Sequence, residues 1–197
     1  MVTLLLFVDF NTISPGANDN LTGTYAAVCA LRMLDMAGID FENTEVCAMI
    51  TDGEEAGLRG CKQWAKDHYD EYVNSGVETA VLCVDTLADL EYLRVYNKDM
   101  TGTVKNNQQF SQLVMDSAKD SGHNDLEFSS VYFGSSDAAA FSQAGITATC
   151  LAAMDPKPAD YYHNRRDTAE RLVPEAIKTG FDVIISTILN FDEKGLN

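Results

Sequence analysis

Basic residues are scarce in this sequence: 14 lysines and arginines stand against 30 aspartates and glutamates in 197 residues, which gives a formal net charge of −16. A field of that sign repels phosphate backbones and anionic lipids, so we expect no nucleic-acid partner and no membrane partner. It favours cationic ligands such as a free amino terminus, although an acidic surface often serves solubility alone.

Long hydrophobic runs are also absent, since no stretch approaches the roughly 18 apolar residues of a membrane-spanning helix. The apolar residues 1–10 follow no basic segment and precede no small-residue cleavage site, which favours a buried strand over a signal peptide. The five cysteines show no CxxC spacing, and most of them lie in apolar stretches. We therefore predict buried free thiols and a cytoplasmic protein.

Apolar runs typical of strands alternate with segments whose apolar residues recur at helical spacing. This alternation predicts an α/β fold with a mostly parallel mixed sheet flanked by helices, and the length suits a single domain over residues 1–197. Strands are expected at 2–8, 45–51, 80–84, 90–96, 130–133 and 148–153, and helices at 21–37, 57–75, 104–121, 136–144 and 174–191.

Acidic residues and one histidine follow the predicted strands. In parallel sheets, ligands bind beyond the carboxyl ends of the strands, so these side chains are expected to converge. Each of them has a simpler alternative, such as an Asx-turn, a solvated first turn of a helix or a surface histidine. The residues in question are Asp9, Asp19, Glu54, Glu55, Asp85 and His163.

Five segments carry a resemblance when they are taken in order. They read GANDNLTG from residue 16, TDGEEAGLRG from 51, VDT from 84, SSDAAAFSQAGITA from 135 and YYHNRRDT from 161. The chain thereby resembles the zinc exopeptidases of metallopeptidase family 28, which include aminopeptidases and glutaminyl cyclases, over residues 1 to about 192. The resemblance implies a three-layer zinc-exopeptidase fold of the phosphorylase/hydrolase-like type.

The resemblance also implies roles for individual residues. The aspartate matching Asp19 bridges two zinc ions and is commonly followed by a cis peptide bond. The residues matching Glu55 and His163 bind one ion, and the residue matching Asp85 binds the other. Glu54 matches the general acid–base, which takes a proton from the attacking water and passes it to the leaving amine. Zinc accepts such mixed nitrogen and oxygen ligands.

The sequence departs from the family pattern at two positions. The His-x-Asp motif reads Phe7-Val8-Asp9, so a histidine ligand is replaced while Asp9, which would steady it, is kept. Asp19, Glu55 and His163 still provide three ligands, and we therefore expect one zinc ion.

A second family histidine, which follows Asp137, is replaced by Ala138. Asp137 and Tyr162 are expected near the substrate.

Several functions follow as alternatives. The first is a zinc-dependent aminopeptidase that hydrolyses the N-terminal peptide bond of a peptide or aminoacyl substrate with a metal-activated water. The second is a degenerate family member that acts as a binding module, which the residues Phe7 and Ala138 favour. The third is a glutaminyl cyclase-like acyltransferase, and the fourth is an acidic domain without metal. An uncovered apolar strand near the N-terminus would also favour a homo-oligomer.

Overall fold

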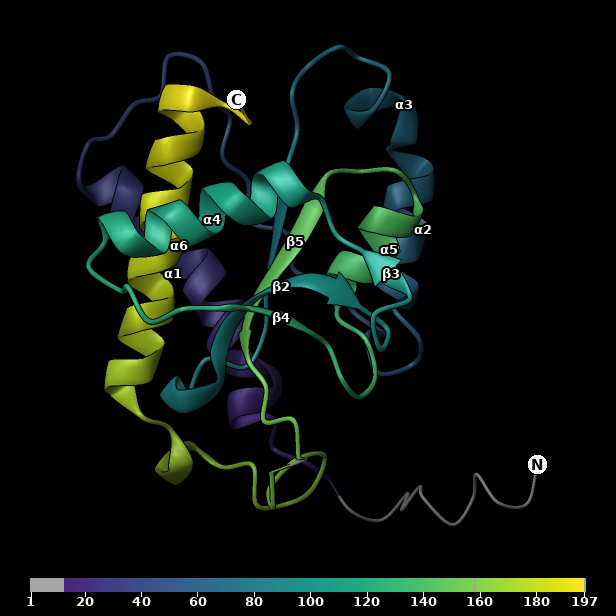
Figure 1. Ribbon diagram of the computed structural model, residues 1–197, viewed down its shortest axis with the longest axis vertical. Helices are drawn as coiled ribbons and strands as arrows, with labels where there is room; N and C mark the ends of the chain where they lie inside the picture. The colour runs from purple at the N-terminus through teal and green to yellow at the C-terminus, as the bar shows by residue number, and fades with distance from the viewer. Residues whose placement is uncertain (1–12, 158, 197) are drawn as a thin grey trace.

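The computed structural model describes residues 13–157 and 159–196, whose strands form one five-stranded sheet (Figure 1). The strand order is β1-β5-β2-β3, and β4 also pairs with β2. Two strand pairs are parallel, β1 with β5 and β2 with β4, whereas β2 runs antiparallel to both β5 and β3. The strands are β1 (Val81–Val84), β2 (Leu93–Asp99), β3 (Val104–Lys105), β4 (Phe128–Ser130) and β5 (Ala148–Ala153).

Helices cover both faces of the sheet (Figure 1). One face carries α1 (Gly23–Met36), α4 (Gln108–Asp120) and α6 (Pro174–Lys194). The other face carries α5 (Asp137–Gln143), against which α2 (Arg59–Asp67) packs, followed by the short α3 (Tyr69–Tyr72). The predicted α/β fold with a mixed sheet between helices is therefore confirmed. Three short helical turns, η2 (Ala17–Thr22), η3 (Leu90–Tyr92) and η4 (Ala169–Arg171), lie in the connections.

The central strand β5 shows why the core has two parts. All six of its residues are buried, as a strand covered on both faces requires. Leu151 and Ala153 belong to the cluster under α1, α4 and α6, whereas Cys150 and Ala152 belong to the cluster under α2 and α5. This division follows from the period of two along a strand, which sends successive side chains to opposite faces.

Several predicted elements are found in altered form. The strand expected over 90–96 is η3 followed by β2, and the helix expected over 104–121 begins only at Gln108, after β3. The helix expected over 57–75 is divided into α2 and α3, because His68 between them has the non-helical angles φ −110° and ψ 10°. The strand expected over 130–133 is found at Phe128–Ser130 instead. The aromatic residues Tyr132 and Phe133 favour a strand by propensity. They are 56% and 69% exposed, and the pairing of β4 with β2 ends at Ser130, before it reaches them.

The strand predicted over 45–51 is wrong, since residues 44–50 form no strand. A strand requires backbone hydrogen bonds to a neighbour, and no described strand pairs with this segment. A cleft of about 890 Å³ lies here, lined by all four residues of β1, by residues 43–51 and by parts of α1 and α6. The strand expected over 2–8 lies outside the described residues.

The thiols are less uniformly buried than expected. Cys61 and Cys150 are buried and Cys83 is partly buried, but Cys29 and Cys47 are exposed. All five cysteines are free thiols, as predicted. The prediction that they are buried is confirmed only for some of them. In the described ranges, the helices lack the combination of length and apolar character that a bilayer crossing requires.

Candidate metal centre

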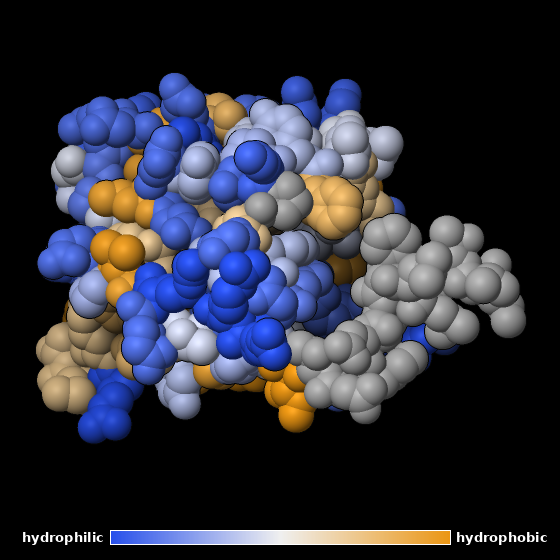
Figure 2. Space-filling view, turned by 90° about the horizontal axis from the view of Figure 1, so that it is seen from below, coloured by the Kyte–Doolittle hydropathy of each residue, from blue (hydrophilic) through white to orange (hydrophobic). Residues whose placement is uncertain are grey.

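Asp19, Glu55 and His163 come together from three separate loops. The Nε2 atom of His163 lies 3.1 Å from Oδ2 of Asp19 and 2.8 Å from Oε1 of Glu55. One ligand atom from each residue lies within 4.8 Å of the other two. The face of the molecule that carries the loop after β5 shows a hydrophilic area at its centre, with separate apolar patches at the left and the bottom of the view (Figure 2). Two carboxylates and one imidazole thus share a single point in space.

Asp19 is fixed by the turn that precedes α1. Gly16 begins this turn with φ 69°, a left-handed value that favours glycine, and a Cβ atom there would lie 2.9 Å from the Asp19 carbonyl oxygen. The Asp19–Asn20 peptide bond is cis, as the resemblance implies. The turn η2 then leads directly into α1, so the Asp19 carboxylate is held at the start of a regular element.

His163 lies in the loop after β5, and its backbone has φ 54°. Few residues other than glycine adopt this conformation, although histidine does so more often than most. The imidazole ring stacks on the ring of Tyr162, with centroids 3.8 Å apart and planes 18° apart. Burial, followed by the charges of Asp19 and Glu55, raises the pKa of the Tyr162 phenol, so this ring stays neutral. Backbone conformation and stacking together set the direction of the imidazole.

The pKa of the His163 imidazole is raised to about 10, chiefly by its hydrogen bonds to Asp19 and then by those to Glu55. At neutral pH the imidazole is therefore protonated on both nitrogens, and its positive charge faces the two carboxylates. Ligand atoms about 2.0–2.2 Å from one tetrahedral zinc ion lie about 3.3–3.5 Å from each other. The two distances at Nε2 are a few tenths of an ångström shorter, so a small widening would let a cation replace the proton.

Glu54 is partly buried beside this group. Its pKa is raised to about 7, first by burial and then by the charges of Glu55, Asp137 and Asp19, while the positive charge of His163 acts in the opposite direction. A carboxyl group with a pKa near 7 gains and loses a proton at neutral pH. This is the property that a general acid–base requires.

Asp85 lies near the group but outside it. It follows β1 directly, and its Oδ1 atom accepts a hydrogen bond of 2.8 Å from the Thr86 N–H. Burial, followed by the charges of Asp19 and Glu54, raises its pKa well above the usual range. Among the described residues, the group of ligand atoms within 4.8 Å contains only Asp19, Glu55 and His163.

Asp137 is the first residue of α5, and its Oδ2 atom accepts a hydrogen bond of 3.0 Å from the Thr51 hydroxyl. Because Asp137 raises the pKa of Glu54, it acts on the candidate base through its charge. Asp9 and Phe7 lie outside the described residues, so the predicted role of Asp9 stays a prediction.

The sequence did not indicate a role for two residues that contact predicted site residues. Asp167 lies four residues after His163 and is 1% exposed, and Thr51 binds Asp137 from the segment before Glu54. Asp167 falls within the YYHNRRDT segment, so an assignment of every polar residue in that segment would have drawn attention to it.

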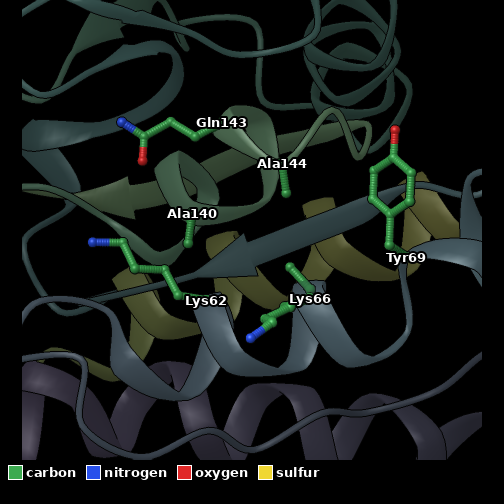
Figure 3. A pocket seen from close by; sticks show the side chains of 7 residues that line it. Lys62, Lys66, Tyr69, Ala140, Gln143 and Ala144 are labelled. Carbon is green, nitrogen blue, oxygen red and sulfur yellow. The ribbon is translucent and has the colours of Figure 1, made fainter.

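A separate hollow of about 450 Å³ lies between α2 and α5 (Figure 3). The side chains that line it include Lys62, Lys66 and Tyr69, but no carboxylate and no histidine. This hollow therefore offers no set of metal ligands.

The sequence matches the profile of peptidase family M28 over residues 7–188. No curated protein matches the chain.

Solved structures show the same fold. The aminopeptidase from Aneurinibacillus sp. strain AM-1 has a TM-score of 0.73 at 21% identity, with 89% of this chain and 39% of that chain covered. The zinc aminopeptidase from Bacillus subtilis has a TM-score of 0.64 at 22% identity, with 89% and 42% covered. The glutaminyl cyclase from an Acidobacteriales bacterium has a TM-score of 0.67 at 17% identity, with 91% and 63% covered. The chain thus spans 39% to 63% of the length of these three proteins.

Proposed function

The chain belongs to peptidase family M28, and on that premise we propose that it is a zinc-dependent aminopeptidase, which removes the N-terminal residue from peptides. The observation that carries the proposal is the meeting of Asp19, Glu55 and His163 beside Glu54. The ligand set of two carboxylates and one imidazole suits zinc and leaves a coordination position for substrate or water.

Within this proposal, Glu54 moves the proton. Zinc, when bound, would polarise the scissile carbonyl and make water acidic at neutral pH. The Glu54 carboxylate takes a proton from the attacking water as the new C–O bond forms. It then gives that proton to the nitrogen of the leaving amine as the C–N bond breaks. A pKa raised to about 7 suits both transfers, because neither form of the side chain is strongly disfavoured at neutral pH.

The surplus of negative charge supports cleavage at the amino end of a peptide. Asp19 and Glu55 would neutralise the two positive charges of one zinc ion. The carboxyl group of Asp137 remains nearby, and its charge contributes to raising the pKa values of Glu54 and Asp85. A protonated α-amino group is the part of a peptide that such carboxyl groups attract, whereas a terminal carboxylate would be repelled.

The proposal is tested by the release of a chromogenic amine from aminoacyl substrates. For Glu54→Gln we expect kcat to fall about 10²–10⁴-fold, since general acid–base catalysis contributes on that scale. Zinc content per chain, measured by elemental analysis, should stay at one ion. Glu193→Gln, an exposed residue near the end of α6, is the matched control and should leave the rate unchanged. A chain that binds no zinc, or a Glu54→Gln variant with full activity, would contradict the proposal.

A binding module is the second candidate. Ala138 is fully buried where the resemblance calls for a histidine, and this departure from the family pattern favours a binding function. Zinc at one ion per chain, without turnover of any aminoacyl substrate, would select this function. Formation of pyroglutamate from a peptide with N-terminal glutamine would instead select the glutaminyl cyclase-like activity.

A further inference from the structure

Hydrogen bonds join the loop that carries His163 to the turn that carries Asp19. Ser14 donates from its hydroxyl to the Asn164 carbonyl at 3.0 Å, and the Ala17 N–H donates to the Asp167 carbonyl at 3.3 Å. The Asn18 side-chain amide donates to the Tyr161 hydroxyl at 3.0 Å. These bonds connect residues that are about 150 positions apart in the sequence, so they exist only in the folded protein.

The Asp167 carboxylate lies at the centre of this contact. Its Oδ1 atom accepts the Asn18 N–H at 2.8 Å, and its Oδ2 atom accepts the Asp19 N–H at 2.9 Å. Asp167 is 1% exposed and Asn18 is 2% exposed, so water does not compete for these bonds. Charge-assisted hydrogen bonds of this kind are shorter and stronger than neutral ones. One side chain in the His163 loop therefore holds the backbone N–H of the Asp19 ligand itself.

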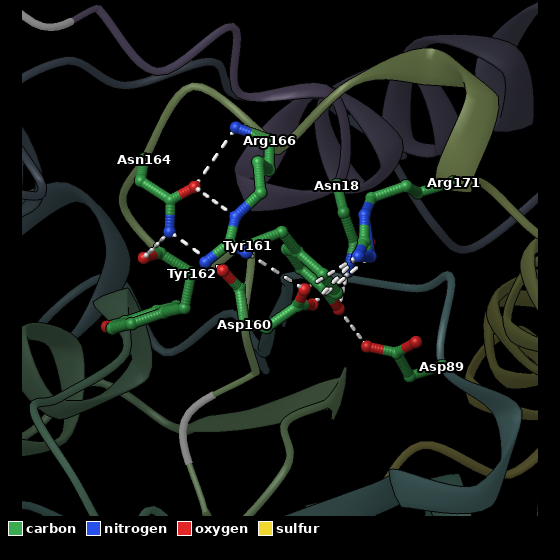
Figure 4. Close-up of polar contacts among 8 residues, drawn as sticks. All are labelled: Asn18, Asp89, Asp160, Tyr161, Tyr162, Asn164, Arg166 and Arg171. Carbon is green, nitrogen blue, oxygen red and sulfur yellow. Dashed lines mark hydrogen bonds and ion pairs between the residues drawn. The ribbon is translucent and has the colours of Figure 1, made fainter.

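Further contacts hold the remainder of the loop (Figure 4). The Tyr161 hydroxyl donates to the Asp89 carboxylate in addition to accepting from Asn18. The Arg171 guanidinium binds the Asp160 carboxylate at 2.8 Å and lies over the Tyr161 ring, 5.1 Å from its centroid. The part of the loop before His163 is thus held by Arg171 and through Tyr161, and the part after His163 is held by Asp167.

We propose that Asp167 is a positioning residue for the metal centre: it sets the separation between the Asp19 and His163 ligands and thereby the affinity for zinc. The inference rests on the proposed function, because it assigns to zinc the point that the three ligands share. Asp167 does not reach this point itself, since both of its oxygens are directed at the backbone N–H groups of residues 18 and 19.

Asparagine at position 167 would have nearly the same shape but cannot make the same bonds. Its side chain has one acceptor oxygen, and its NH₂ group is a donor. One of the two backbone N–H groups would then face another donor in a buried position, where no water replaces the lost partner. We expect the Asp19 turn to move away from the His163 loop as a result.

The zinc dissociation constant of the full chain is measured by competition with a chromophoric chelator. Asp167→Asn should weaken binding about 10–100-fold, the usual effect of removing a partner of a metal ligand. Asp160→Asn is the matched control, because it makes the same charge change in the same loop at an exposed position that contacts Arg171. It should change the affinity by less than about twofold, since exposed ion pairs contribute little.

A second measurement separates positioning from general stability. With Co²⁺ in place of zinc, the visible absorption bands report the geometry of the ligands. Asp167→Asn should alter these bands, whereas Asp160→Asn should keep the wild-type spectrum at a matched fraction of folded protein, measured by circular dichroism.

The outcomes distinguish the inference from the proposed function. Absence of zinc binding by the wild-type chain would contradict the proposed function. A wild-type chain that binds zinc, with the same affinity and cobalt spectrum in Asp167→Asn, overturns the inference and leaves the function standing. If Asp167→Asn does not fold, Tyr161→Phe removes the neighbouring contact to Asn18 and should weaken zinc binding severalfold. An unchanged affinity in this variant also overturns the inference.

Discussion

Asp19 and His163 lie on two segments that are joined by five hydrogen bonds in addition to the contact between their own side chains. Glu54 and Glu55 lie on a turn held mainly by its own backbone. In that turn, the Gly57 and Leu58 N–H groups donate to the Glu54 carbonyl at 2.9 and 2.8 Å. The side chain of Asp19 is 14% exposed and that of Glu55 is 61% exposed.

This difference indicates that the two sides of the centre have different roles. On the proposed function, the Asp19 and His163 side would define where an ion is held, because buried and partly buried hydrogen bonds join the two segments that carry these residues. The Glu54 and Glu55 side adds a third ligand and the candidate base from a more exposed turn. An exposed turn with few contacts to other segments adjusts at low free-energy cost when substrate binds.

The largest expected effect on zinc affinity comes from removing one candidate ligand on each side of the centre. We expect His163→Ala to weaken zinc binding more than 100-fold, beyond the range that partners of ligands contribute. Glu55→Ala should weaken it less, because this carboxylate is the most exposed of the three and its place can be taken by water. Chelator competition gives both dissociation constants. Equal losses would contradict the division between the two sides.

The pH dependence of activity tests the role of Glu54 as the general base. Glu54 acts as a base only when it is deprotonated, and its pKa is raised to about 7 by burial and by neighbouring carboxylates. Below that pKa, kcat/KM should therefore fall about tenfold per pH unit, and it should recover as pH rises. A bound cation lowers the pKa of a nearby carboxyl group, so the acid limb should lie at or below pH 7. A rate that does not change between pH 5 and pH 8 would argue against Glu54 as the base.

The smallest expected effect concerns Asp137. Its negative charge raises the pKa of Glu54, so Asp137→Asn should move the acid limb to lower pH by about half a unit. Asp35→Asn, at an exposed position near the far end of α1, serves as the control and should leave the limb in place. Zinc affinity should be unaffected by either change. A shift toward higher pH would show that Asp137 acts in another way.

Elements with a strong pattern of their own were predictable from the sequence. The apolar run over 148–153 coincides with β5, and the helix expected over 174–191 is α6. The strand expected over 45–51 was wrong because a strand depends on a neighbour that local sequence does not reveal. The single domain, the homo-oligomer, the cytoplasmic location and the strand over 2–8 stay predictions.

The candidate site was predictable to a similar degree. Position after strands and the order of five short segments indicated Asp19, Glu55 and His163, because loops at the carboxyl ends of strands converge. Asp167 belongs to the YYHNRRDT segment, but the sequence indicates no role for it. Its partners lie 148 and 149 positions away, and nothing in the sequence around it indicates which N–H groups it accepts.

The amino-acid order alone determined the fold class, the acidic character and the kinds of side chain available for a metal, because these follow from local pattern and residue chemistry. Folding decided which carboxylates share the imidazole of His163, why Asp85 remains outside their group, and how near neutrality Glu54 titrates. Those properties depend on distance and burial, and both arise only when remote segments pack against each other.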